Sequence, residues 1–571
     1  MQVGKIRVLL INCRDKEQEQ MDNMPQLFLN KFYEKRLRKK ISAEYVSLLS
    51  GALAACGGGT NESTSGFPEN YSPPSPSFDP STILDSYHHI LRSEYREPYW
   101  VQSLTMNMHE AVVPLMLEEY SRTVAFAFPV EQPDYDQFGI TGWDPATEPI
   151  KVATREILGK FEQVLDLSFV EVDHVNATNV ITIAQSSQAT TAGLSYFPNT
   201  HYEVGMDVFI SKGYASPRFM SELITNYDYE VLVHELGHAL GLKHPFEADG
   251  SNVIVLSAYE DNTQNTAMSY DDNPITFNGT LRPLDWMALT KLYGVKSSYN
   301  AGDDAYSFSS LGGTFIIDGA GLDTISAADT LRDVTVDLRP GAHSHLGSKS
   351  SYITSANQLT ISHGSDIENV ETGSGDDIVI ANALENIIIT GAGDDTIFAG
   401  DGADFIRSGT GSDRIDLSES NQAVDTVSVD ASLFDLGFDT IYGFAQGAEG
   451  DVLDLTDILE TGADLFPLVA VGAAPMANFS AGVLRLVGDA LTTSTDLVSA
   501  LGVGGALSSL SMSDGARSII VSAASQDMGE DQFIYYAQGS SDGFQISQLA
   551  LLKGNALDID LWHASNFGLV A

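Results

Sequence analysis

GSGDDIVIA, NALENIIIT, GAGDDTIFA, GDGADFIRS and GTGSDRIDL follow one another without a gap in residues 373–417. Four of these nine-residue units begin with Gly-x-Gly, and the second has lost its glycines but keeps the period. A low-complexity loop would not hold five units in phase, so the run predicts a stack of structural repeats. The fifth position holds Asp377, Asn386, Asp395, Asp404 and Asp413, and the seventh holds Val379, Ile388, Ile397, Ile406 and Ile415.

Each unit has the composition of a turn followed by a short strand, and stacked units of this kind form a parallel β-roll around the aliphatic residues. The aspartates, with turn carbonyls, supply the oxygen ligands that calcium prefers. Carboxylates on one side of the roll are eighteen residues apart, which pairs Asp395 with both Asp377 and Asp413. The pair of Asn386 and Asp404 should bind most weakly, because one charge is missing. The glycines that permit the turns are Gly373, Gly375, Gly391, Gly393, Gly400, Gly402, Gly409 and Gly411.

Calcium should decide whether this roll folds. Without calcium the rows of carboxylates repel one another, and the aliphatic core is too thin to hold them together. We therefore predict a roll that is unfolded at intracellular calcium levels and folded at extracellular levels. Residues 319–325 form an isolated unit of the same kind, and the pattern leaves its use as a cation site open.

Upstream of the repeats, residues 234–245 read His-Glu-Leu-Gly-His-Ala-Leu-Gly-Leu-Lys-His-Pro. Residues four apart share one helix face, so His234 and His238 can bind one ion, and neutral imidazoles suit zinc. Glu235 lies beside that pair, where a carboxylate can take a proton from water on the metal. Gly241 can end the helix and turn the chain, which lets His244 return as a third ligand. Three protein ligands leave a position open for water, as in catalytic zinc sites.

A second motif, Thr-Ala-Met-Ser-Tyr at 266–270, strengthens this hypothesis. HExxH alone occurs by chance in ordinary helices, but a Gly and a third His at fixed places make coincidence remote. Met268 matches the methionine turn that lies beneath the metal in metzincin proteases, and a tyrosine two residues later is more selective than a methionine alone.

With these motifs the chain resembles the serralysins, which are secreted bacterial zinc endopeptidases of the metzincin group. A proline after the third histidine, here Pro245, distinguishes serralysins from other metzincins. The resemblance implies an α+β metzincin domain and a zinc ion held by three histidines. It also implies that a glutamate is the general base and that a tyrosine ligates zinc at rest and then stabilises the oxyanion. The matching residues are His234, His238 and His244 for zinc, Glu235 for the base, and Tyr270 for the tyrosine.

The segments around the motif suit such a domain. Residues 194–200 resemble the edge strand to which serralysins add their substrate as a further strand, which implies substrate contacts from Leu194, Tyr196 and Phe197. Alternating apolar residues predict strands, and helical apolar spacing predicts helices. The expected strands are 123–128, 180–184 and 206–210, and the expected helices are 149–165 and 284–294.

The chain therefore divides into four expected segments. Residues 439–444 and 451–456 resemble the β-sandwich cap that follows the repeats in serralysins, and the resemblance fades beyond about residue 460. The fold class is an α+β metzincin domain followed by an all-β parallel roll and a β-rich C-terminal region. The segments are a leader with linker at 1–84, the protease domain at 85–295, the roll with the serralysin-type C-terminal domain at 296–460, and a β-rich region with a type I secretion signal at 461–571.

The composition of the chain excludes some classes of binding partner. The 571 residues include 77 Asp and Glu against 30 Lys and Arg, a formal net charge of −47. Such a surface repels phosphate backbones and anionic membranes, which disfavours nucleic acid as a partner. A hydrophobic content of 43% argues against wholesale disorder. We expect a monomer without a transmembrane span that acts on proteins and peptides.

Two export routes are open at the N-terminus. Leu-Ala-Ala-Cys at 53–56, preceded by a basic run at 35–40 and followed by three glycines, resembles a lipoprotein signal with Cys56 as the lipidated residue. The alternative is an unstructured leader or propeptide. The repeats favour type I secretion into the medium, although the last residues, 566–571, lack the acidic residue usual in that signal. We therefore expect a secreted extracellular protein, with a lipid-anchored surface protein as the alternative.

Two functions compete. The leading hypothesis is a calcium-stabilised zinc endopeptidase exported by the type I secretion machinery. The other is a non-catalytic adhesion or calcium-binding protein with a decayed protease domain. Every side chain that the protease motif requires is present, which favours the enzyme.

Overall fold

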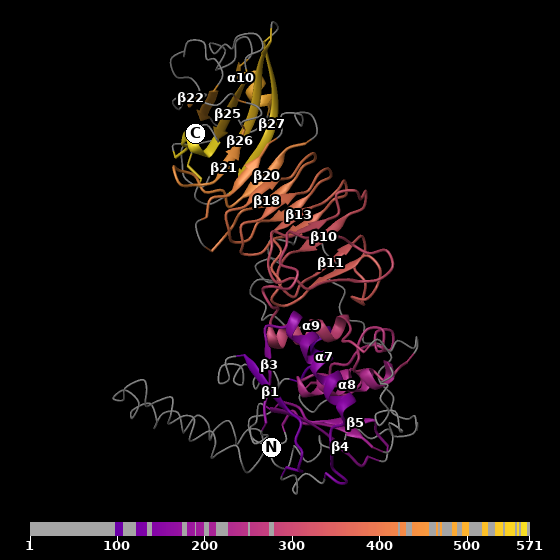
Figure 1. Ribbon diagram of the computed structural model, residues 1–571. Helices are drawn as coiled ribbons and strands as arrows, with labels where there is room; N and C mark the ends of the chain where they lie inside the picture. Colours follow the sequence, from indigo (N-terminus) through magenta and orange to yellow (C-terminus); the bar gives the residue numbers. More distant parts are fainter. Residues whose placement is uncertain are drawn as a thin grey trace, which may run out of the picture.

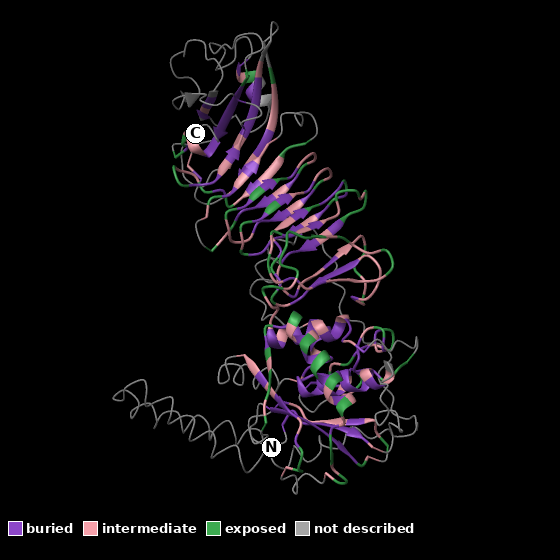
Figure 2. Ribbon diagram, viewed as in Figure 1, coloured by how far each residue is buried: buried purple, intermediate pink, exposed green. Residues whose placement is uncertain are grey.

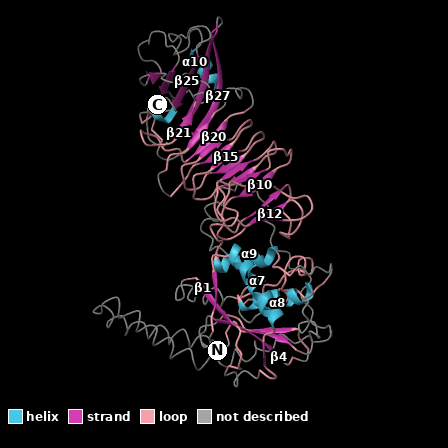
Figure 3. Ribbon diagram, in the orientation of Figure 1, coloured by secondary structure: helices cyan, strands magenta, loops and turns pink. Residues whose placement is uncertain are grey.

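Figure 1 shows a computed structural model of the chain, in which a mixed α/β unit is followed by a long stack of strands. Helices gather in the first unit, whereas strands and turns make up most of the stack (Figure 3). The leader and Cys56 lie outside the described residues. The structure describes residues 98–106, 113, 122–133, 140–173, 180–188, 190–198, 205–212, 226–248, 252–272, 279–420, 423–429, 437–455, 459, 464–465, 469–470, 482–487, 494–501, 517–523, 531–540, 543–553, 557–558 and 561–567.

A six-stranded, mainly parallel sheet forms one layer of the first unit. Its strands are β1 (Thr123–Ala127), β2 (Asp144–Pro145), β3 (Ser168–Glu171), β4 (Val180–Ser186), β5 (Gly193–Ser195) and β6 (Val208–Ser211). The order is β3-β1-β4-β6-β5, with β2 paired to β4. β5 runs antiparallel to β6 and is the last strand on that side of the sheet. The edge of the sheet is therefore the segment that the sequence predicted to be an edge strand.

Helices cover the sheet on the side that faces the roll (Figure 1). They are α7 (Glu148–Val164), α8 (Asn226–Ala239) and α9 (Pro283–Tyr293), with the single-turn α5 (Tyr99–Gln102) against α9. Buried apolar residues recur on one side of α7 at helical spacing, including Ile150, Ile157 and Phe161. Gly294 ends α9 with a positive φ of 74°. The predicted strands and helices of this unit are confirmed, with ends shifted by one or two residues.

The repeats form a roll of two facing sheets. One sheet contains β8 (Thr314–Ile316), β10 (Val334–Asp337), β11 (His343–Leu346), β12 (Gln358–Ile361), β14 (Ile378–Ile380), β16 (Thr396–Phe398), β18 (Arg414–Asp416) and β20 (Asp439–Tyr442). The other contains β7 (Ala305–Tyr306), β9 (Thr324–Ser326), β13 (Asn369–Glu371), β15 (Ile387–Ile389), β17 (Phe405–Arg407), β19 (Thr426–Ser428) and β21 (Val452–Asp454). Successive repeats alternate between the sheets, so strands eighteen residues apart pair in parallel, for example Val379 with Ile397. The predicted parallel roll is confirmed.

The interior of the roll is narrow. The aliphatic residues at the seventh position of the five repeats were predicted to point inward, and none of them has exposed surface. They are Val379, Ile388, Ile397, Ile406 and Ile415. Figure 2 shows buried strand positions flanked by exposed turns. A buried aliphatic side chain contributes about 1.5–3 kcal/mol, which is small against the conformational entropy lost in ordering nine residues. A Cβ at any of the eight repeat glycines would overlap the backbone of the turn beneath it, so these positions exclude larger residues.

The two sheets continue past the last repeat. β20 and β21, which the sequence assigned to a separate sandwich cap, instead extend the two sheets of the roll. The spacing along the chain is no longer nine residues, yet the strand register is kept, with Ile441 paired to Ile415 and Leu453 paired to Val427. The first sheet then continues through β27 (Gly543–Lys553), β26 (Gln532–Ser540), β25 (Arg517–Ala523), β24 (Gly482–Val487), and β22 (Asp464–Leu465) and β23 (Val469–Ala470).

The C-terminal segment closes the end of the roll core. Trp562 stacks on Phe567 at 4.5 Å between ring centroids, and both are buried in the hydrophobic cluster of the roll. Phe567 ends a short 3₁₀ helix, η5 (Ala564–Phe567), and the outer face of the extended sheet carries α10 (Ser494–Leu501). Within the part of the chain described, no helix combines the length and apolar character needed to cross a bilayer.

Candidate metal and catalytic site

The Nε2 atoms of His234, His238 and His244 converge on one point. The Nε2 atom of His244 lies 3.2 Å from that of His234 and 3.1 Å from that of His238. Tetrahedral zinc with bonds of about 2.0–2.1 Å needs ligand nitrogens about 3.3 Å apart. The three imidazoles therefore fit a zinc ion without rearrangement, and among the described residues they form one of two groups with metal-ligand spacing.

The backbone orients these imidazoles. His234 and His238 occupy one face of α8, and Gly241, with a φ of 105°, turns the chain so that His244 faces them. The Nδ1 atom of His234 lies 2.8 Å from the carbonyl oxygen of Ala267, and that of His238 lies 2.7 Å from that of Leu242. A carbonyl can only accept, so Nδ1 donates and Nε2 keeps the lone pair that a metal needs.

Burial keeps the His234 imidazole uncharged at neutral pH. Together with a smaller effect of the neighbouring His244, it lowers the pKa of His234 to about 3. The Nδ1 atom of His244 faces the Glu247 carboxylate at 3.0 Å, which supplies the same orienting contact that the two carbonyls supply elsewhere. All three rings thus have a partner behind them.

Glu235 belongs to α8, and its side chain reaches the edge strand β5. Its carboxylate accepts a hydrogen bond of 2.8 Å from the Ser195 hydroxyl at the end of β5. Burial raises the pKa of Glu235 to about 8, and the Ser195 hydrogen bond opposes that shift. A side chain at Gly193 would overlap the Glu235 carboxylate, so the glycine keeps this place open for it. The role of Ser195 was not predicted from the sequence.

Tyr270 stands at the open side of the histidines. Its hydroxyl lies 2.9 Å from the Nε2 atom of His244, and its ring stacks on the His234 ring with 5.7 Å between centroids. The residue is 56% exposed, so its side chain can move without unpacking the core. Phe246 stacks on the outer face of His244 at 5.1 Å and borders the same surface.

The residues predicted to form the substrate strand lie beside the site. Leu194 is in β5 and pairs with Phe209 of β6, while Tyr196 and Phe197 follow the strand. The Phe197 ring meets the His238 ring edge-on at 5.4 Å. The structure thus brings the edge strand and the histidines together.

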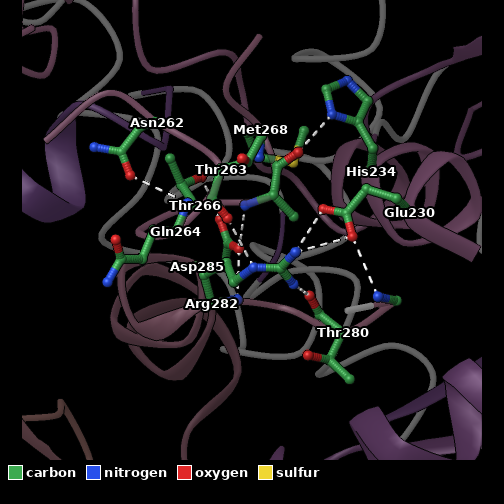
Figure 4. A network of polar contacts seen from close by, with 12 residues as sticks. Glu230, His234, Asn262, Thr263, Gln264, Thr266, Met268, Thr280, Arg282 and Asp285 are labelled. Atoms are coloured by element: carbon green, nitrogen blue, oxygen red, sulfur yellow. Dashed lines mark hydrogen bonds and ion pairs between the residues drawn. The ribbon is translucent and has the colours of Figure 1, made fainter. Parts of the chain in front are cut away.

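Met268 and a buried carboxylate support the segment beneath the histidines (Figure 4). Met268 is fully buried, and a Cβ at Gly237 of α8 would lie 2.8 Å from its sulfur. Asp285 accepts hydrogen bonds from the Thr266 hydroxyl at 2.6 Å and from the Ala267 amide at 2.8 Å. Because the Ala267 carbonyl faces His234, this carboxylate connects the start of α9 to a zinc-ligand candidate.

A buried ion pair adjoins this network. Arg282, whose amide donates to Asp285, forms a two-pronged pair with Glu230 of α8 at 2.9 Å for each contact. On the other flank of the histidines, the buried Lys243 ammonium donates to the carbonyls of Glu247 at 2.7 Å and Ile254 at 3.3 Å. Sequence reasoning missed these residues. Glu230 and Arg282 are far apart in the sequence, and the carbonyls that Lys243 meets carry no side-chain signal.

Asp285→Asn should destabilise the first unit. One of the three donors that face the carboxylate would then meet an amide NH₂, and an unsatisfied buried donor costs about 1–3 kcal/mol. Urea unfolding followed by tryptophan fluorescence, to which Trp286 of α9 contributes, measures the loss. Asp272→Asn, at an exposed position, is the charge-matched control. Equal unfolding midpoints for both variants would contradict this role of Asp285.

The repeat carboxylates form ladders along the roll. The Asp395 carboxylate accepts from the Asp377 amide, and the Asp413 carboxylate accepts from the Asp395 amide, at 2.8 and 2.9 Å. The Asp404 carboxylate likewise accepts from the Asn386 backbone amide at 2.8 Å. The residues predicted to pair, eighteen positions apart in the sequence, are therefore neighbours in the roll. The second oxygen of each aspartate named here is buried and accepts no hydrogen bond. Such orphaned oxygens fit a bound cation.

The ladders extend beyond the repeats that the sequence revealed. Asp439 continues one ladder after Asp413, while Asp425 and then Asp451 continue the other after Asp404. Insertions change their spacing in sequence, which hides them from a search for a nine-residue period. At the other end, Asp304, Asp318 and Asp323 bring carboxylate oxygens within 4.8 Å of one another, and Asp323 belongs to the isolated unit at 319–325.

Burial raises the pKa of the ladder carboxylates, and neighbouring carboxylates raise it further. The pKa rises to about 8 for Asp395 and Asp404 and to about 7 for Asp425. Amide donors partly oppose the shift. Without a cation these groups are therefore partly protonated in the folded roll.

Comparison with known proteins found a matching family model and several similar proteins. A family model described as the RTX calcium-binding nonapeptide repeat matches residues 380–415 in four copies. Serralysin of Proteus mirabilis is 30% identical over 297 residues, which cover 45% of this chain and 59% of that protein. Serralysin B of Dickeya chrysanthemi is 31% identical, covering 39% and 51%, and metallopeptidase AprA of Pseudomonas marginalis is 26% identical, covering 46% and 60%.

The fold and the comparisons define a mixed α/β unit joined to a calcium-binding roll of RTX repeats. Within that class, the chain resembles the serralysin-type RTX metalloproteases, as its motifs predicted. The matched regions span roughly half to three fifths of the length of these relatives.

Proposed function

We propose that the chain is a secreted, zinc-dependent metalloendopeptidase whose protease part is a metzincin domain. The observation that carries this proposal is the convergence of three histidine Nε2 atoms at 3.1–3.2 Å beside one buried carboxylate. The names of two similar proteins, serralysin and metallopeptidase, support the same reaction class. His234, His238 and His244 would hold the zinc, which when bound lowers the pKa of water and polarises a peptide carbonyl.

Glu235 is suited to move the proton. It can accept a proton from the attacking water and pass it to the leaving amine, because burial places its pKa near neutrality. The Ser195 hydroxyl, at the end of β5, holds the carboxylate in place by donating a hydrogen bond to it. The Tyr270 hydroxyl, 2.9 Å from His244, can donate to the oxygen that gains negative charge.

The edge strand is suited to hold the substrate. A peptide can add to β5 as a further strand, with main-chain hydrogen bonds that do not depend on sequence. Side chains of the peptide would then meet Leu194, Tyr196 and Phe197, next to His238. Binding along an extended edge favours cleavage inside a chain rather than at its ends.

The remaining assignments follow from the same proposal. Residues 85–295 would be the protease domain, 296–460 the roll with its C-terminal domain, and 461–571 a region with the type I secretion signal, after a leader at 1–84. The RTX repeats would make folding depend on extracellular calcium. The protein would be a secreted monomer, with a lipid anchor at Cys56 as the alternative.

Refolded full-length chain with zinc and calcium should cleave casein at internal peptide bonds. Mass spectrometry of the products identifies the bonds, and a zinc-selective chelator such as 1,10-phenanthroline should stop the reaction. Calcium is kept constant, so loss of activity reports on zinc alone. Cleavage that proceeds unchanged with the chelator would refute the proposal.

A further inference from the structure

A turn of the roll, residues 350–355, packs into the unit that carries the histidines. Ile353 of this turn is 2% exposed and belongs to the hydrophobic core of the first unit. Beside it the Tyr352 ring stacks on Tyr259 with 4.7 Å between centroids. The roll therefore contributes a core residue to the other unit.

A buried carboxylate joins the two units at this contact. Glu260 has no exposed surface. Its Oε1 atom accepts from the Thr354 hydroxyl at 3.0 Å and the Thr354 amide at 3.3 Å, and its Oε2 atom accepts from the Tyr99 hydroxyl at 2.8 Å. The Tyr99 hydroxyl in turn accepts from the Ile353 amide at 3.2 Å. Three segments distant in sequence thus meet at one side chain.

Glu260 lies in the loop that leads to the predicted methionine turn. Its carbonyl accepts from the Asn265 side chain at 3.0 Å, and the Thr266 amide donates to the Asn262 carbonyl at 3.1 Å. The next residue, Ala267, presents its carbonyl to His234 at 2.8 Å. A short, internally bonded path therefore runs from the roll turn to a zinc-ligand candidate.

We propose that Glu260 is a positioning residue through which the folded roll holds the Ala267–Tyr270 segment in its catalytic geometry. The inference rests on the proposed function. It goes further by making the rate of hydrolysis depend on contact between roll and loop, beyond the stability that calcium gives to the roll. A displacement of about 1 Å remote from the reacting atoms can cost up to 10²-fold in rate, so a loosened contact should affect kcat.

Thr354→Val tests the contact most cleanly. Valine has nearly the shape of threonine but lacks the hydroxyl that donates to Glu260, whereas Thr354→Ser keeps that donor. We expect Thr354→Val to lower kcat on a short peptide about tenfold, with KM, zinc content and calcium-dependent strand content unchanged. Thr354→Ser should retain the wild-type kcat. Ser355→Ala is the matched control, because it removes a hydroxyl that bonds only within the turn, to Ser350.

Glu260→Gln provides a second test with the charge removed. Its amide nitrogen would face either Tyr99 or Thr354, so kcat should fall while the roll still folds. Equal kcat for Thr354→Val and wild type would overturn the inference and leave the proposed function standing. So would a loss shared by Ser355→Ala. An inactive wild-type chain would instead refute the proposed function itself.

Discussion

Glu235→Gln should strongly slow peptide hydrolysis while leaving the fold and the zinc content unchanged. Glutamine keeps an oxygen that can accept from Ser195, but it cannot take a proton. General acid–base catalysis contributes typically 10²–10⁴-fold, and we expect kcat to fall by about that factor. Casein cleavage and zinc analysis on the same preparation measure both quantities.

The matched control is Glu148→Gln in the first turn of α7. Glu148 is exposed and pairs with Lys151, remote from the histidines, so this variant should keep wild-type activity. Comparable activity of Glu235→Gln and Glu148→Gln would remove Glu235 from the mechanism.

Calcium removal should unfold the roll, and more completely at pH 8 than at pH 5. In the calcium-free folded roll, burial and neighbouring carboxylates raise the pKa of Asp395 and Asp404 to about 8. A raised folded-state pKa stabilises the fold in acid, below the unfolded value near 4, and this stability is lost as pH rises toward 8. Strand content by circular dichroism in a chelator should therefore fall as pH rises from 5 to 8.

Calcium should reverse that trend, because it binds the ionised carboxylates. Asp395→Asn removes a charge shared by two eighteen-residue pairs, and we expect the calcium midpoint of folding at pH 8 to rise about tenfold. Glu148→Gln, at an exposed position of α7 outside the roll, removes a charge of the same sign and should leave this midpoint unchanged. A circular dichroism signal for strands that changes with neither calcium nor pH would contradict the proposed dependence of roll folding on calcium.

The parts of this fold that follow from local pattern could be predicted from the sequence. A nine-residue period fixes which side chain points inward, so Val379 and Ile397 are adjacent as expected. Four-residue spacing and one glycine likewise suffice to bring His234, His238 and His244 together. In each case the geometry is determined within about twenty residues.

The parts that depend on distant segments could not be predicted. Asp285, in a helix some fifty residues after His234, bonds to Thr266 and Ala267, and nothing in the sequence around it indicates these two partners. Glu260 is fully buried, and its carboxylate bonds to Thr354 of a roll turn more than ninety residues later and to Tyr99 far upstream. Asp439 and Asp451 continue the carboxylate ladders beyond insertions in the sequence. Their strands keep the pairing register of the roll, although the nine-residue period is lost there.

The most direct test of the central claim is a zinc titration of the zinc-free full-length chain at saturating calcium, with bound zinc and casein cleavage measured in the same samples. The proposal predicts that activity rises in proportion to bound zinc and reaches its maximum at one zinc per chain. Full activity before zinc is added, or one bound zinc without any cleavage, would contradict it.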